Sequence, residues 1–184
     1  MRNVQGAISI RNHQVILQGE ILFQRDQSMP NVQFFSELYR ELKLAYPKFF
    51  KMDPLAKLGF LAAELLLSPL SAEDKEEMKI FLACSHSSIE SDTMFQNTIS
   101  DESDYYPSPS LFVYTLPNIV IGEIAIRHKI YGENSLQLTS PLNFNSIIKT
   151  LHKQIKWEEN RYALIGYLDY YNDKYKAEFY LIHS

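Results

Sequence analysis

The sequence predicts a layered α/β fold in which strands alternate with helices along one domain of 184 residues. Two observations predict it. Segments with alternating or continuous apolar residues recur along the chain, and segments with apolar residues at helical spacing separate several of them. The chain is long enough to bury one core, and no repeat, low-complexity tract or charge block divides it. We therefore expect a single domain over residues 1–184.

The first third of the chain is expected to hold two strands and two helices. Strands are predicted over Val4–Ile10 and Val15–Phe23, where apolar residues alternate with polar ones. A helix is predicted over Pro30–Tyr46, because apolar residues recur there at helical spacing. A second helix is predicted over Leu55–Leu67, preceded by a capping aspartate and a proline at its first position. This helix is apolar nearly all round and should be buried.

The rest of the chain continues the alternation of strands and helices. The expected strands are Met78–Cys84, Ser135–Ser140, Tyr162–Tyr170 and Lys176–His183, the last two joined by a turn at Asn172-Asp173. The expected helices follow Pro117 within the apolar segment Leu111–Ile130 and cover Leu142–Lys156. The expected loops are Ser85–Ser91, leading to Thr93–Thr98, and Asp101–Pro109.

The composition excludes several classes of protein. A net charge of −4 argues against a nucleic-acid-binding protein, which would need a basic patch. The single cysteine excludes an internal disulfide and a multi-cysteine metal site. No signal-type stretch follows Met1, and the longest apolar run is too short to span a bilayer. We therefore expect a cytoplasmic protein that needs neither cofactor nor metal.

The segment Pro107–Asn145 carries the most specific pattern, PSPSLFVYTLPNIVIGEIAIRHKIYGENSLQLTSPLNFN. It resembles the part of a ketosynthase that leads to the nucleophilic cysteine, which typically reads "SP…F…LPN…AG.IAIR.GL.GPN…TACA". A second stretch, Phe49–Gly59, resembles the helix before the second core strand of ketosynthases. A third, Arg161–Asp169, resembles the strand after the active-site helix. The resemblance covers most of the chain in the right order, and the N-terminal ~45 residues match least.

The spacing of the pattern places Pro141 where a ketosynthase has its cysteine. Proline has no thiol, and it lacks the backbone N–H that commonly helps to hold the oxyanion of such sites. It nevertheless suits the first position of a helix, because its φ is fixed near the helical value. The sequence therefore predicts that the strand-to-helix turn still forms but carries no nucleophile. We hence expect a protein without ketosynthase activity.

The resemblance is greatest to short ketosynthase-like proteins of aryl-polyene and flexirubin-type pathways. These correspond to the N-terminal half of a ketosynthase, so we expect a thiolase-like layered α/β fold restricted to that half. The second half of a ketosynthase brings two histidines and a glycine-rich turn, and this chain ends before them. The surface that would pack against that half is expected to be apolar and to need a partner.

The resemblance implies the role of a chain length factor. Such a protein pairs with an active ketosynthase, helps to shape the tunnel for the growing acyl chain, and carries no nucleophile. A role in polyene or fatty-acid-type biosynthesis follows, with an acyl carrier protein as a further partner. The strand Ser135–Ser140 would then pair with its equivalent in the partner. The residues expected at the interface or tunnel are Phe112, Tyr114, Leu116, Pro117, Asn118, Ser135, Gln137 and Thr139. Each could instead be an ordinary core residue.

Two alternative functions stay open. A small acyl-transfer or hydrolytic enzyme could use Cys84, with His86 as its base, if the imidazole reached the thiol. A lone cysteine at the end of a buried strand is more often a small apolar residue. A homodimeric acyl-binding module is the other alternative, and a homodimer is open in place of a heterodimer.

Three other groups of polar residues have ordinary explanations. The serines around His86 lack a nucleophile-elbow motif and are expected in a solvated loop. The carboxylates Asp101, Glu102 and Asp104 are expected in a solvated turn, because they follow no calcium-binding pattern. Arg127 and Lys129 could meet the acidic surface of a carrier protein, as could any exposed base.

Overall fold

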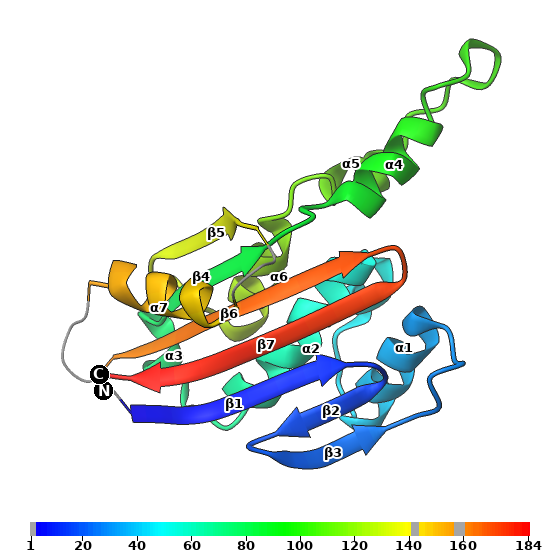
Figure 1. Cartoon of the computed structure of the whole chain (residues 1–184). Helices are drawn as coiled ribbons and strands as arrows, with labels where there is room; N and C mark the ends of the chain where they lie inside the picture. Colours follow the sequence, from blue (N-terminus) through cyan, green and yellow to red (C-terminus); the bar gives the residue numbers. More distant parts are fainter. Residues whose placement is uncertain (1–2, 141–143, 157–160) are drawn as a thin grey trace.

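The computed structural model describes residues 3–140, 144–156 and 161–184 as one mixed sheet with helices on both faces (Figure 1). The strands are β1 (Asn3–Arg11), β2 (Gln14–Leu17), β3 (Glu20–Gln24), β4 (Lys79–Cys84), β5 (Asn134–Leu138), β6 (Tyr162–Tyr171) and β7 (Lys174–His183). The α-helices are α1 (Asn31–Glu41), α2 (Pro54–Leu67), α3 (Ala72–Glu76), α4 (Ile89–Asn97), α5 (Pro109–Val113), α6 (Ile119–His128) and α7 (Phe144–Gln154). Two short 3₁₀ helices are η1 (Pro47–Lys51) and η2 (Glu102–Asp104).

The seven strands form one sheet in the order β3-β2-β1-β7-β6-β4-β5. β4 runs parallel to both β5 and β6, whereas the other neighbouring strands are antiparallel. The two ends of the chain lie side by side in Figure 1, because the start of β1 pairs with the end of β7. β5 is consequently the edge strand at the parallel end of the sheet.

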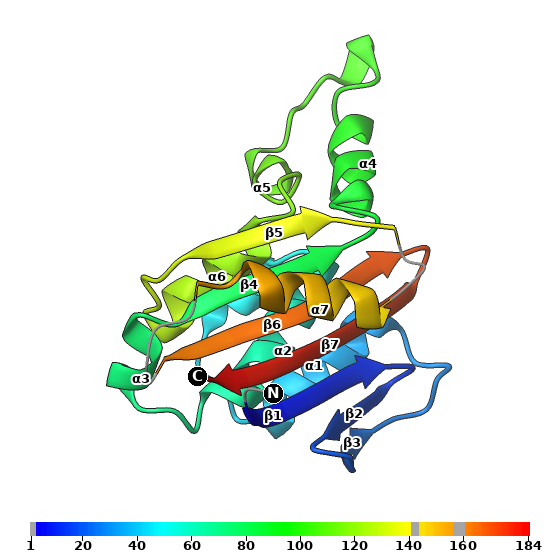
Figure 2. The same ribbon diagram turned by 60° about the vertical axis from the view of Figure 1, so that its left-hand side comes forward.

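Helices cover the two faces of the sheet unequally. The larger core lies between the sheet and α2, where Phe60, Leu61 and Phe179 are fully or almost fully buried. The opposite face carries α7, seen in front of the sheet in Figures 1 and 2. Leu151 of α7, and Ile155 just after the helix, belong to the second core cluster with residues of β4 and β6. This arrangement confirms the layered α/β fold that the sequence predicts.

The described part of α7 has a polar outer side. Leu151 and Ile155 face the sheet and are buried, whereas Lys149, Thr150 and Lys153 are exposed. The helix is therefore amphipathic, and its outer side is suited to water.

The structure corrects the expected boundaries at several places. The predicted strand Val15–Phe23 is two strands, because Gln18 and Gly19 have positive φ angles of 52° and 90° and reverse the chain. The apolar segment Leu111–Ile130 contains two helices separated by Tyr114–Asn118. The helix α3 was not predicted, since four of its five residues are charged and none is buried.

The α2 helix begins where the sequence predicts. The side chain of Asp53 accepts a hydrogen bond from the backbone N–H of Ala56 (2.9 Å), and Pro54 occupies the first position. Gly59 brings α2 close to α6, because a Cβ at this position would lie 2.3 Å from Cγ2 of Val120. A glycine is needed there for close approach of the two helices.

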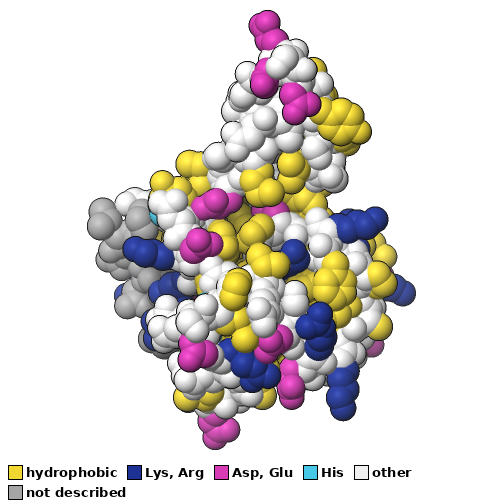
Figure 3. All heavy atoms as spheres, turned by 90° about the vertical axis from the view of Figure 1, so that its right-hand side faces the viewer, with side chains coloured by type: hydrophobic (Ala, Val, Ile, Leu, Met, Phe, Trp, Pro, Cys, Tyr) yellow, Lys and Arg dark blue, Asp and Glu magenta, His cyan; other side chains and the backbone are white. Residues whose placement is uncertain are grey.

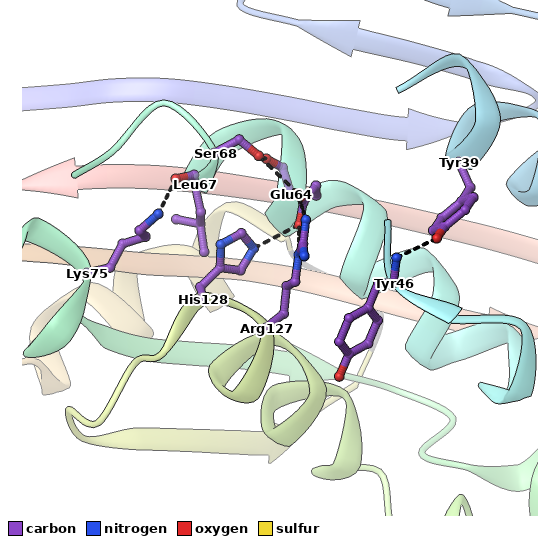
Figure 4. A network of polar contacts seen from close by, with 8 residues as sticks. All are labelled: Tyr39, Tyr46, Glu64, Leu67, Ser68, Lys75, Arg127 and His128. Atoms are coloured by element: carbon purple, nitrogen blue, oxygen red, sulfur yellow. Dashed lines mark hydrogen bonds and ion pairs between the residues drawn. The ribbon is translucent and has the colours of Figure 1, made fainter. Parts of the chain in front are cut away.

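A buried polar network fixes α6 on α2 (Figure 4). Glu64 of α2 accepts hydrogen bonds from Nε and Nη2 of Arg127 at 3.0 and 2.8 Å. Nε2 of His128 lies 3.2 Å from the same carboxylate, which is close enough for an ion pair. The geometry of this contact is not that of a hydrogen bond. Burial alone would raise the pKa of Glu64, but His128 and Arg127 outweigh it and lower the pKa to about 2. Arg127 is thus engaged inside the domain.

Candidate partner interface

The edge strand β5 is open to pairing on one side. Within the described residues it pairs only with β4, and its sequence, NSLQL, has neither a charge nor a proline. Natural proteins usually protect such an edge with a charged side chain, a proline or a bulge. β5 therefore offers a backbone edge to another strand.

The hydrogen bonds that flank β5 show which of its backbone groups face outward. The N–H of Ile80 donates to the carbonyl of Glu133, and the N–H of Thr139 donates to the carbonyl of Cys84, both at 2.9 Å. Because backbone groups alternate in direction along a strand, Ser135 and Gln137 also face β4. The N–H and carbonyl groups of the alternate residues, Asn134, Leu136 and Leu138, consequently point away from the sheet.

Residues 85–118, which we call the arm, project beyond the sheet (Figures 1 and 2). The arm contains α4, η2 and α5. It exposes large apolar side chains, including 78% of Tyr106, 56% of Phe112 and 53% of Leu116. Figure 3 shows hydrophobic side chains on the arm and at its base. Single exposed apolar residues are ordinary, but a group of them on one projection is typical of an interaction surface.

Polar contacts hold the arm to the rest of the domain. The hydroxyl of Ser91 donates to Oδ2 of Asp53, outside the arm, at 2.8 Å. The hydroxyl of Ser88 donates to the carbonyl of Thr115 at 2.5 Å and joins the two ends of the arm. Burial raises the pKa of Asp53, although its hydrogen bonds oppose this effect. Within the arm, the rings of Phe95 and Phe112 lie 5.3 Å apart. These contacts order the arm and its apolar side chains before a partner binds. Because less conformational freedom is then lost on association, the entropic cost of binding is lower.

The structure places the eight predicted interface residues at the base of the arm and on β5. Tyr114 is buried, and its hydroxyl donates to Oε1 of Glu123 at 3.4 Å. Burial raises the pKa of Tyr114, with the charge of Glu123 acting in the same direction. The exposed ones are Phe112, Leu116 and Asn118, and the half-buried ones are Pro117, Ser135, Gln137 and Thr139.

Pro141, which the sequence pattern predicts at the position of the ketosynthase cysteine, lies outside the described residues. Its neighbour in the sequence, Ser140, follows β5 at the end of the sheet from which the arm starts. The absence of a nucleophile at position 141 is a property of the sequence alone.

In the second candidate site, the thiol of Cys84 is buried and the imidazole of His86 contacts a carboxylate. Cys84 is fully buried, and burial raises the pKa of its thiol to about 11. Nδ1 of His86 lies 2.6 Å from Oδ2 of Asp169, and the imidazole stacks on Tyr171 with ring centroids 4.3 Å apart. The N–H groups of Ser85 and His86 also donate to Asp169, at 3.2 and 2.9 Å. These contacts anchor the start of the arm and direct the imidazole to a carboxylate.

The serine-rich segment differs from the predicted solvated loop, because Ser88 and Ser91 are buried and hydrogen-bonded at the base of the arm. The acidic segment is the predicted exposed turn, in which Asp101 accepts from the N–H and the hydroxyl of Ser103 at 2.8 and 2.6 Å.

No group of residues suited to a metal ion is found in the described part of the chain. Nor is any described helix long and apolar enough to cross a membrane.

Sequence reasoning missed part of this surface. Tyr105 and Tyr106 lie in a proline-containing acidic segment, and Leu138 was expected only as part of a strand. Two adjacent tyrosines in a polar loop are a signal that could have indicated an interaction surface, since aromatic residues are enriched at interfaces.

The fold is that of ketosynthases and chain length factors. The ketosynthase ApeO in complex with its chain length factor ApeC from Xenorhabdus doucetiae is similar at a TM-score of 0.63, with 11% identity over 100% of this chain and 79% of that one. The ishigamide ketosynthase/chain length factor has a TM-score of 0.67, with 14% identity over 98% of this chain and 61% of that one. A type II polyketide synthase ketosynthase in complex with its acyl carrier protein (AntDE:AntF) has a TM-score of 0.61, with 12% identity over 98% and 61%.

These similarities concern the fold. The chain spans 61% of the length of two of the similar structures and 79% of the third. No protein-family model matches the sequence, and no curated protein is similar to it. The thiolase-like fold that the sequence predicts is thus confirmed at the level of three-dimensional structure.

Proposed function

We propose that this chain is a non-catalytic, chain-length-factor-like subunit that pairs with an active ketosynthase in polyene or fatty-acid-type biosynthesis. The observation that carries the proposal is the unpaired edge of β5, which lies on the same domain as an arm with exposed Phe112 and Leu116. An open backbone edge beside apolar side chains is suited to a partner that adds a strand and covers the arm. Solved structures with a similar fold include complexes of a ketosynthase with its chain length factor.

The non-catalytic role rests on two arguments. The sequence has Pro141 where a ketosynthase has its cysteine. The only thiol of the chain, Cys84, is fully buried, and a buried thiol with a pKa of about 11 is a poor nucleophile at neutral pH. The chain would therefore contribute shape to a shared acyl site, and the partner would contribute the chemistry.

The first test is co-expression with an active ketosynthase from the same organism, followed by measurement of the mass of the complex. We expect a stable one-to-one heterodimer whose condensation activity depends on this chain. A monomer or homodimer that does not bind the ketosynthase would contradict the proposal. Condensation by the isolated chain would contradict it as well.

A substitution in β5 tests the proposed edge. Leu138→Pro removes an outward N–H, while the bonds from β5 to β4 involve other residues. Because Leu138 is 63% exposed, the domain should still fold. Loss of one interface hydrogen bond and the steric conflict of proline should weaken the heterodimer roughly tenfold or more. The matched control is Leu138→Thr, which keeps the N–H and suits a strand. Equal affinity of the two variants would argue against pairing through β5.

The alternatives from the sequence predict other results. An enzyme that uses Cys84 would lose its activity in Cys84→Ala, whereas a ketosynthase partner would keep the activity of its complex. A homodimeric acyl-binding module would dimerise without a ketosynthase and would release lipid on extraction. The carrier protein in one of the similar complexes makes an acyl carrier protein a further partner to test.

A further inference from the structure

The arm, residues 85–118, carries the negative charge of this protein. It contains five acidic residues and neither lysine nor arginine, which gives it a formal net charge of −5 with histidine neutral. The other 150 residues hold 17 acidic and 18 basic residues, a net charge of +1. Figure 3 shows Asp and Glu side chains at the outer end of the arm, whereas the Lys and Arg side chains lie on the body of the domain. The arm thus differs from the rest of the chain in its charge.

Cations of the same chain do not neutralise this charge. Within the described residues, no Lys or Arg forms an ion pair with a carboxylate of the arm. Three exposed carboxylates lie in η2 and directly before it, those of Asp101, Glu102 and Asp104. The pKa of Asp101 lies below its ordinary value, because the hydroxyl and the N–H of Ser103 donate to its carboxylate. The outer end of the arm is therefore anionic at neutral pH.

Two exposed tyrosines beside η2 give a second, independent indication. Tyr105 is 62% exposed and Tyr106 is 78% exposed. The N–H of Tyr106 donates to the carbonyl of Thr98 at 2.9 Å, so this segment is held at the end of α4. Neither ring lies against another ring or a cation of the described residues. Because the face of a tyrosine ring attracts the guanidinium of arginine and the ammonium of lysine, the rings fit the same cationic side chains as the carboxylates.

The surface that covers the arm must also accept apolar side chains. α5 exposes Phe112 and Val113, and Leu116 is exposed after it. A surface that fits the whole arm therefore combines an apolar groove with Arg or Lys side chains. An acyl carrier protein with an acidic surface would be repelled by the arm. A second copy of this chain would offer a body with a net charge of only +1.

We infer that the arm docks on a basic surface of the ketosynthase partner, where Arg or Lys side chains flank an apolar groove. The inference rests on the proposed pairing with a ketosynthase, and it adds the chemistry of the surface that receives the arm. The carboxylates of Asp101, Glu102 and Asp104 form ion pairs with these cations, and the rings of Tyr105 and Tyr106 lie against them. Opposite charges on the two proteins accelerate their encounter, and salt screens this effect.

The test measures the rate constants of association and dissociation between the full chain and the ketosynthase, at low salt and at about 0.3 M salt. The informative variant neutralises the outer end of the arm by combining Asp101→Asn, Glu102→Gln and Asp104→Asn. The matched control changes the net charge equally, in and directly after α3, by combining Glu73→Gln, Glu76→Gln and Glu77→Gln. All six side chains are exposed, so both variants should fold.

We expect the arm variant to associate about tenfold more slowly than the wild type at low salt, and we expect this difference to shrink at high salt. The control should associate nearly as fast as the wild type. The variant Tyr106→Ala should dissociate about fivefold faster, because it loses the ring face. Tyr106→Phe keeps that face and should dissociate like the wild type.

The outcomes separate this inference from the proposed function. If the complex forms but the arm variant and the control associate at equal rates, the basic docking surface is overturned and the pairing stands. A homodimer of the isolated chain that the arm variant weakens would also overturn the inference. If the wild type forms no complex with the ketosynthase at either salt concentration, the inference and the proposed function both fail.

Discussion

Replacing Glu64 with Gln tests whether the buried ion pair between α2 and α6 stabilises the domain. The carboxylate of Glu64 is 6% exposed and contacts Arg127 at 2.8 Å and His128 at 3.2 Å. The Glu64→Gln variant keeps the shape and one acceptor oxygen but removes the negative charge. The guanidinium of Arg127 would then lie beside a neutral group, and breaking a buried ion pair in this way is strongly destabilising.

The size of the effect follows from the pKa of Glu64. Its carboxylate has a pKa of about 2 in the folded domain and an ordinary value of 4.5. This difference, at about 1.4 kcal/mol for each unit of pKa, corresponds to about 3 kcal/mol of stabilisation at pH 7. Because the pKa of the folded state is lowered, this stabilisation is complete above pH 4.5 and is lost as the pH falls toward 2. At pH 3 about 1 kcal/mol should be left.

The assay is urea denaturation of the wild type and Glu64→Gln at pH 7 and pH 3. We expect the free energies of unfolding to differ by up to about 3 kcal/mol at pH 7 and by clearly less at pH 3. The control is Glu37→Gln, which breaks the surface ion pair with Arg25 and should change stability little. If Glu64→Gln behaved like Glu37→Gln at pH 7, or if its effect did not change with pH, the reasoning would be refuted.

Two further predictions concern packing and thiol chemistry. Gly59→Ala should destabilise the domain by about 1–3 kcal/mol in thermal or urea denaturation, because its Cβ would lie 2.3 Å from Val120 and 3.0 Å from Leu168. Val120→Ala should recover part of that loss, and an additive double variant would contradict the close contact. Cys84 should not react with a thiol reagent at pH 8 until the protein is unfolded, because it is buried and its pKa is about 11. Rapid reaction of the folded protein would show that the thiol is accessible.

The parts of the fold that the sequence predicts well are those set by local patterns. β6 and β7 lie within two residues of their predicted ends, and the turn at Asn172 and Asp173 has positive φ angles of 49° and 57°, which Asn and Asp tolerate. The buried helix α2 starts at the predicted cap. The split of Val15–Phe23 was missed because an apolar alternation continues across Gly19, and only the backbone angles show the reversal.

The candidate interface could be predicted only in part. The resemblance to ketosynthases predicts Phe112 and the strand Ser135–Ser140 at the interface, and this strand corresponds to β5. The projection of the arm depends on contacts between residues far apart in the sequence, such as Ser91 with Asp53, and no local pattern reports these. The outward direction of Leu138 likewise depends on which backbone groups of β5 bind β4, and this register is a property of the sheet.

The distribution of exposed apolar residues decides where a partner should bind. The described outer side of α7 presents Lys149 and Lys153. Of the large apolar side chains that are exposed in the described part of the chain, seven lie on the arm, and Leu138 lies at the end of β5. Because a polar helix face gains little from being covered, the free energy of association should come from the arm and from strand pairing. A partner that contacts these two elements and leaves α7 in water would account for both observations.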